Sequence, residues 1–181
     1  MLEASLSEAG VWGLSNLELS EFPDTGRGVR SLSALRRGDP ILELPPSVLW
    51  TSARALADPT LGPVLAALSP ALPVDDVLAV FLLFVKSRVD GYDLEREHVA
   101  VLPRTYSSSI FFTDAELAVC SGSSLHAVTQ RLQQQVHDDH VALVARLFST
   151  RPDLFPPDAF SLAEVRIYIL ILFYFLFFSC L

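Results

Sequence analysis

The sequence predicts an α+β fold in which a small unit of short β-strands precedes a mostly helical region. Three observations lead to this prediction. Residues 11–51 hold short apolar segments separated by Gly and Pro turns, which is typical of a small β unit. From residue 52 to about residue 166, apolar residues recur instead at helical spacing. Of the 181 residues, 51% are hydrophobic and 19% are charged, and this composition is that of a globular chain with a core.

The β unit is predicted from alternation and from turn residues. Residues 17–22 (LELSEF) alternate apolar and polar side chains with the period of two that a half-buried strand requires. Residues 23–26 (PDTG) are turn formers and end this strand, and a second turn is expected at residues 37–40 (RGDP). The further strands predicted here are residues 27–35, 41–44 and 48–50.

The first half of the helical region is predicted to contain one buried helix. Prolines at positions 59, 63, 70 and 73 cut residues 52–73 into short pieces. Asp75 is a suitable N-cap for a helix that continues to about Val89. Its residues are apolar nearly all round, and a helix with no polar face belongs in the centre of a fold.

The second half of the helical region carries clear helix start signals. Residues 110–112 (IFF) form a short strand or an apolar anchor, and residues 113–116 (TDAE) are a capping box that starts a short helix. An amphipathic helix of about six or seven turns is expected from Ser123 or Ser124 onward, and the Arg-Pro pair at residues 151–152 ends it. A second capping box at residues 161–164 (SLAE) starts a last helix.

Charge and cysteine usage exclude several classes of protein. The net charge is −8, Lys86 is the single lysine, and no basic cluster exceeds Arg36–Arg37, so binding to nucleic acid is not expected. An acidic surface suits a basic partner such as a lysine-rich peptide, and it equally suits plain solubility. Cys120 and Cys180 form no CxxC pattern, and the amino terminus has no secretory signal, so an intracellular location in cytoplasm or nucleus is the expectation.

Residues 167–181 form an uncharged apolar tail without an amphipathic period. Spanning a bilayer takes about 20 apolar residues, and this segment is shorter. Three interpretations are open: an anchor inserted in or lying on a membrane, a buried core helix, or an aberrant terminus from a truncated or misjoined coding sequence. The abrupt change in composition after Arg166 favours the last of these.

An ordered set of motifs resembles one protein family. Residues 22–29 (FPDTGRGV) and 36–45 (RRGDPILELP) resemble the opening of a SET domain, of the type found in the RuBisCO large-subunit methyltransferase and its relatives. Residues 82–88 (LLFVKSR), 101–106 (VLPRTY) and 111–117 (FFTDAEL) resemble later elements of that group at family-like spacing. The resemblance covers roughly residues 10–166, and it implies an incomplete SET domain with a mostly α-helical insertion and an apolar C-terminal helix.

The resemblance also implies a chemistry. Members transfer a methyl group from S-adenosylmethionine to a protein lysine, so a protein substrate carrying lysine is the implied partner. Thr25, Gly26, Arg27 and Gly28 would form the first part of the cofactor-binding site through main-chain contacts, because glycine has no Cβ to block a close approach. From the residues alone, a plain hairpin turn remains the alternative.

Other parts of the family pattern have no counterpart in the chain. The family's cofactor-binding Asn-His-Ser segment and its late Tyr are not matched; the single asparagine is Asn16. We therefore assign no catalytic residue and expect a truncated, inactive enzyme. The alternative is a non-catalytic helical interaction module held at a membrane by residues 167–181. His137 and His140 have metal-ligand spacing but no third ligand, so a metal site is not predicted.

The expected division of the chain follows from these patterns. The N-terminal SET β segment is placed at residues 11–51, the helical SET insertion at 52–166, and the apolar tail at 167–181.

Overall fold

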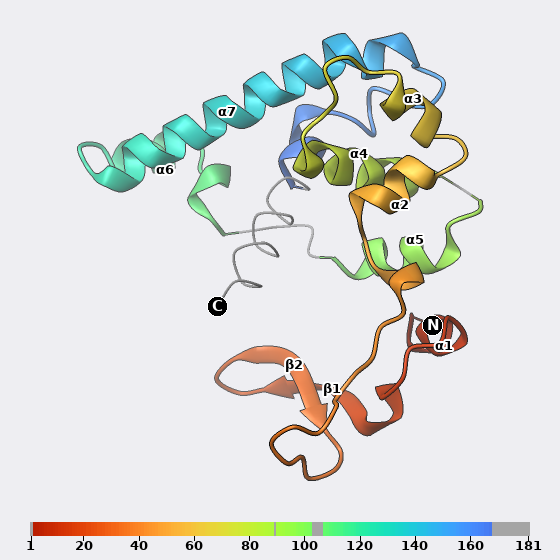
Figure 1. Cartoon of the computed structure of the whole chain (residues 1–181). Helices are drawn as coiled ribbons and strands as arrows, with labels where there is room; N and C mark the ends of the chain where they lie inside the picture. Colours follow the sequence, from red (N-terminus) through yellow and green to blue (C-terminus); the bar gives the residue numbers. More distant parts are fainter. Residues whose placement is uncertain (1, 89, 103–106, 168–181) are drawn as a thin grey trace.

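The computed structural model describes residues 2–88, 90–102 and 107–167, and its elements fall into two regions. The β-hairpin lies at one end of the molecule, the helices other than α1 gather at the opposite end, and α1 lies between them, beside α5 (Figure 1). The two strands are β1 (Leu17–Phe22) and β2 (Gly26–Ser31). The helices are α1 (Leu2–Glu8), α2 (Ser52–Ala57), α3 (Gly62–Ala66), α4 (Val74–Ser87), α5 (Asp93–Val101), α6 (Asp114–Val119) and α7 (Ser124–Arg146). Short 3-10 turns are η1 (Leu14–Asn16), η2 (Pro46–Val48), η3 (Ser109–Phe111) and η4 (Phe148–Thr150), and residues 162–167 are again helical.

The hairpin confirms the first predicted strand and overturns two others. β1 and β2 pair antiparallel, with Leu17 opposite Ser31 and Phe22 opposite Gly26. Residues 41–44 form no regular strand; they contribute one isolated antiparallel bridge, between Trp12 and Glu43. The prediction of a strand at residues 48–50 is also wrong, because η2 starts at Pro46. Proline supplies no N–H to a ladder and fixes φ, so the two prolines at 45–46 interrupt pairing here.

The predicted central helix is α4. It begins at Val74, and its N-cap residue is Pro73 rather than the predicted Asp75, which lies in the first turn. The carboxylates of that first turn still complement the positive end of the helix. The run from Val77 to Val85 is almost wholly buried, as a helix without a polar face requires. The surrounding core comes mainly from α2, α3, α5, α7 and the segment after α7.

A cluster of phenylalanines closes the core beside α4. The rings of Phe148, Phe155 and Phe160 lie with centroids 4.9–5.4 Å apart, and Phe84 of α4 reaches Phe155 at 6.5 Å. These distances are typical of aromatic pairs that gain energy beyond the area they bury. The chain after α7 is thereby held against the central helix.

The start of the amphipathic helix predicted after Ser123 is confirmed by α7, but the helix ends at Arg146, before the predicted stop at residues 151–152, and only its second half packs as the pattern suggests. Val136 and Leu143 are buried, whereas Leu125 and Val128 near its start are exposed. The start of α7 extends with α6 beyond the helical core (Figure 1). The capping box at Thr113 and Glu116 is formed as predicted, with both reciprocal hydrogen bonds present.

Helix α5 was not expected from the sequence. Its residues are mostly polar, so the apolar period that would mark a helix is weak. It is held by side chains instead. Trp50 Nε1 donates a hydrogen bond to His98 Nδ1 at 2.8 Å, and Arg54 of α2 forms an ion pair with Glu95. Helix α1 also contacts α5, where Ser5 donates a hydrogen bond to Glu97 at 2.8 Å.

The Trp50–His98 hydrogen bond predicts a pH-dependent stability. Burial lowers the pKa of His98 below its usual value, and Nδ1 accepts the Trp50 proton only while the imidazole is neutral. The folded state therefore binds fewer protons than the unfolded chain as the pH falls below about 6.5. We expect His98 to contribute a decrease in the urea midpoint of unfolding below that pH. Asp76, whose pKa burial raises to about 6, contributes in the opposite direction, and it does so equally in the parent chain and in variants of His98.

The variant His98→Asn tests this assignment, because an amide oxygen accepts the same hydrogen bond without titrating. Its urea midpoint should fall less between pH 7.5 and pH 5.5 than that of the parent chain. His137→Asn, at an exposed position of α7, is the matched control and should keep the full decrease. Equal decreases in all three proteins would show that His98 does not carry the effect.

Over residues 2–88, 90–102 and 107–167, no helix is both long and apolar enough to cross a membrane. Of the apolar tail 167–181, residues 168–181 lie outside the described part of the chain. The predictions for that tail, and the boundaries at residues 11, 51 and 166, stay predictions.

Candidate functional site

The tip of the hairpin brings together the four residues predicted to contact a cofactor. The Thr25 N–H donates to the carbonyl of Phe22 at 3.3 Å and closes the turn. Gly26 then has a φ of +73°, a left-handed conformation that side-chain-bearing residues seldom adopt. Thr25, Gly26 and Arg27 are exposed, and Gly28 is half-buried. The Arg27 side chain forms no ion pair with a described residue, so the tip is open on its outer side.

The two glycines differ in their surroundings. A Cβ at Gly26 would have no atom of the protein within 4 Å, whereas a Cβ at Gly28 would lie 3.0 Å from the ring of Phe22. The ring of Phe22 therefore rests over Gly28 on the face of the hairpin that also carries the Glu18–Arg30 ion pair, whose atoms are 2.9 Å apart. Side-chain contacts therefore stabilise this face of the hairpin, whereas the Cβ side of Gly26 at the tip is open.

One edge of β2 offers main-chain groups to a ligand. Among the described residues, the sheet has two strands, so β2 pairs with β1 along one side only. In an antiparallel pair, alternate residues point their N–H and C=O groups away from the partner strand. Along the segment from Gly26 to Ser31 these outward groups are available for hydrogen bonds to another strand or to a polar ligand.

The opposite face of the hairpin is apolar and uncovered by described residues. Leu19 and Val29 lie opposite each other in the register, and their exposed fractions are 64% and 60%. Further exposed apolar residues of the β unit are Trp12, Leu32, Leu35, Ile41, Leu42 and Leu44. An exposed apolar surface of this kind is typical of an interaction site, so this face of the hairpin is a contact surface for another segment or for a partner.

The two histidines with metal-ligand spacing, His137 and His140, have different surroundings in the structure. His140 Nε2 lies 3.0 Å from the carbonyl oxygen of Phe160 and ties α7 to the chain after it. His137 is exposed and lines a cavity. Among the described residues, no three His, Cys, Asp or Glu side chains are grouped to hold a metal ion.

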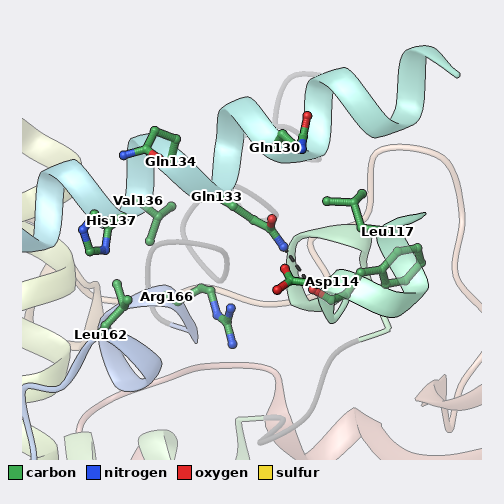
Figure 2. Close-up of a pocket in the computed structure, with 10 residues that line it drawn as sticks. Asp114, Leu117, Gln130, Gln133, Gln134, Val136, His137, Leu162 and Arg166 are labelled. Atoms are coloured by element: carbon green, nitrogen blue, oxygen red, sulfur yellow. Dashed lines mark hydrogen bonds between the residues drawn. The ribbon is translucent and has the colours of Figure 1, made fainter. Parts of the chain in front are cut away.

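A cavity of about 440 Å³ was not foreseen from the sequence. It lies between α6, α7 and the last helical residues, and Figure 2 shows the side chains that line it. Its lining residues are Phe112, Asp114, Leu117, Gln130, Gln133, Gln134, Val136, His137, Leu162 and Arg166. The signal in the sequence is a polar stripe on α7, at positions 130, 133, 134 and 137, which a helix places on one face.

The order of the elements and the comparisons with known proteins point to one class of protein. A β-hairpin with a glycine-containing tip, followed by a mostly helical region in this order, is similar in sequence and fold to part of the SET domain of lysine methyltransferases such as Rubisco LSMT. The resemblance noted in the sequence is thereby confirmed.

Particular relatives support this assignment. The chain is 28% identical over 151 residues to the ribulose-1,5 bisphosphate carboxylase/oxygenase large subunit N-methyltransferase of Pisum sativum, matching 83% of this chain and 29% of that protein. It is 27% identical over 156 residues to SET domain-containing protein 4 of Mus musculus, matching 86% of this chain and 34% of that protein. The chain thus spans about a third of the length of these curated relatives. No protein-family model matches it.

Solved structures show the same fold. The SET domain of LSMT bound to MeLysine and AdoHcy superposes with a TM-score of 0.79 at 23% identity, over 93% of this chain and 37% of that one. Rubisco LSMT bound to AdoMet superposes with a TM-score of 0.77 at 24% identity, over 92% of this chain and 38% of that one.

Proposed function

We propose that this chain carries the first part of a methyl-donor site of a SET-type protein-lysine methyltransferase. S-adenosylmethionine is the donor that the proposal assigns to it, and a lysine of a protein substrate is the acceptor. Thr25, Gly26, Arg27 and Gly28 are the residues proposed to contact the donor through their main chain.

The open outer side of the hairpin tip is the observation that carries this proposal. The donor is polar and charged, so binding it requires hydrogen bonds from groups that it can approach closely. Gly26 has no neighbour within 4 Å on its Cβ side, and the outward main-chain groups of β2 are unpaired among the described strands. A main-chain site needs no particular side chain at these positions, only a glycine that leaves the approach open.

Methyl transfer has further requirements that Thr25, Gly26, Arg27 and Gly28 do not fulfil. Methyl transfer is an in-line displacement, in which the sulfonium supplies the methyl group and a neutral amine attacks it. The amine must be deprotonated and aligned, and no described residue of the hairpin tip supplies a channel for it. We therefore propose that the chain alone holds a partial site, binds the donor weakly and transfers no methyl group.

An NMR titration with S-adenosylmethionine tests the proposed site. We expect saturable shifts of the backbone amides of residues 25–28, with a dissociation constant weaker than about 1 mM because most of the family's contacts are unmatched. The exposed turn at Gly38, which also has a positive φ and an open Cβ side, is an internal control and should not shift. Absence of any saturable shift at residues 25–28 would refute the site.

A matched pair of variants separates the site from general effects. Gly26→Val and Gly38→Val place the same branched side chain on backbones of similar conformation, with open space in both cases. Gly26→Val should abolish the titration shifts, and Gly38→Val should leave them unchanged. A micromolar dissociation constant for the parent chain, or methyl transfer to a lysine peptide, would contradict the proposal that the site is partial.

A further inference from the structure

We propose that the cavity between α6, α7 and the last helical residues binds a short peptide segment, one aliphatic side chain with the peptide groups on either side of it. The proposal concerns a second site, away from the hairpin, and it goes beyond the proposed methyl-donor function. A volume of about 440 Å³ lies within the usual range of ligand sites, about 300–1,000 Å³. The chemistry of its lining selects the ligand.

Arg166 supplies hydrogen-bond donors at one side of the cavity. Its guanidinium lies over the ring of Phe111, 4.8 Å from the ring centre, and its Nε is fully buried without a hydrogen-bond partner. Figure 2 shows the side chain extending from the last helical residues into the space facing α6. Arg166 donates to no acceptor among the described residues, so its terminal N–H groups are available to a ligand.

Gln133 and Asp114 supply acceptors at the other side. The Gln133 Nε2 donates to the carbonyl oxygens of Ile110 and Phe112, at 3.0 and 3.1 Å. Both partners are acceptors, so the orientation of this amide is settled and its Oε1 is left as an acceptor. Asp114 lies in the first turn of α6, where its carboxylate suits the positive end of the helix. It is labelled beside Gln133 in Figure 2.

Apolar side chains lie between the donor and the acceptors. Leu117, Val136 and Leu162 come from α6, α7 and the last helical residues, and each lines the cavity. Leu117 and Val136 are buried, so the apolar part of the lining is set back from solvent. An aliphatic side chain placed against these residues would lose contact with water, which favours binding.

These three features together fit a peptide rather than a charged small molecule. An anion would be attracted to Arg166 but repelled by the carboxylate of Asp114. A cation would be attracted to Asp114 but repelled by the guanidinium of Arg166. A peptide group is neutral and carries one acceptor and one donor, so its C=O suits Arg166 and its N–H suits Asp114 or Gln133 Oε1. Peptide groups on both sides of an aliphatic side chain satisfy both sides of the cavity at once.

Acetyl-leucine N-methylamide is the probe, because it holds one aliphatic side chain between two peptide groups and no charge. In an NMR titration of the full chain without methyl donor, we expect saturable shifts of the Arg166 Nε–H signal and of the Leu117 and Val136 methyl signals. For a ligand of this size the dissociation constant should be near 1 mM. Acetyl-leucine methyl ester lacks one N–H donor and should bind at least about threefold more weakly.

Two variants and one control complete the test. Arg166→Gln shortens the side chain and removes its charge, and Asp114→Asn removes the carboxylate at an exposed position; each should weaken binding at least about threefold. Arg131→Gln, an exposed position of α7 outside the cavity lining, makes the same change as Arg166→Gln and should bind like the parent chain. Shifts that do not saturate, or equal affinities in all four proteins, would overturn the proposal. No methyl donor is present, so such a failure leaves the proposed function of the hairpin untouched.

Discussion

Replacing Phe155 by alanine is expected to lower the free energy of unfolding by about 3–5 kcal/mol, the usual loss when a buried phenylalanine is truncated. Phe155 is 1% exposed and contacts the rings of Phe84, Phe148 and Phe160. The variant removes apolar area and leaves a cavity that these rings can fill only in part. Urea unfolding followed by circular dichroism measures the change.

The control is an apolar residue that is almost fully exposed. Val119 is 86% exposed at the end of α6, and Val119→Ala should change the free energy of unfolding by less than about 0.5 kcal/mol. If Phe155→Ala cost no more than Val119→Ala, the phenylalanine cluster would not be the part of the core that holds the chain after α7.

Replacing Gly13 by alanine is expected to break the contact between the amino-terminal segment and residues 41–44. Gly13 has a φ of +95°, and a Cβ built there would lie 2.3 Å from the carbonyl oxygen of Ile41. Main-chain atoms cannot yield as a flexible side chain does, so the two segments must separate. The Trp12–Glu43 bridge, whose two hydrogen bonds are each 3.0 Å long, would be lost.

Gly10→Ala separates the effect of close approach from that of backbone conformation. Gly10 has a φ of +87° and no atom within 4 Å of its Cβ position, so both variants incur the strain of a left-handed backbone, about 1–2 kcal/mol, and only Gly13→Ala adds the overlap. We expect hydrogen exchange of the Trp12 and Glu43 amides to be faster in Gly13→Ala than in Gly10→Ala by at least about tenfold. Equal exchange rates would mean that the close approach to Ile41 does not hold the bridge.

The elements that could be predicted are those whose signal is local. The strand at Leu17–Phe22 follows from alternation, the start of α6 from the Thr113–Glu116 capping box, and the buried state of α4 from its lack of a polar face. Each of these depends on neighbours within one or two turns of chain. The glycine turn at residues 25–28 was found in the same way, through a motif that is continuous in sequence.

The features that could not be predicted depend on partners distant in the chain. Helix α5 is held by Trp50, Arg54 and Ser5, all at least 41 positions away from the residues they contact. The strand predicted at 41–44 was wrong because an apolar pattern shows only that a segment suits a sheet, and among the described residues this segment pairs through one bridge, with Trp12. Leu125 and Val128 carry a core-like spacing on α7, but the helix extends past the core at that point.

The sequence by itself determined where β1, α6 and α7 begin, which helix is central, and which glycines mark the proposed donor site, because these depend on side-chain period, caps and backbone freedom. Only the tertiary structure decided that the outer side of the hairpin tip stays open, and that Arg166, Gln133 and Asp114 meet around one cavity. Those three residues lie on separate helical segments, and their meeting depends on how α6, α7 and the last helical residues pack, which no local pattern encodes.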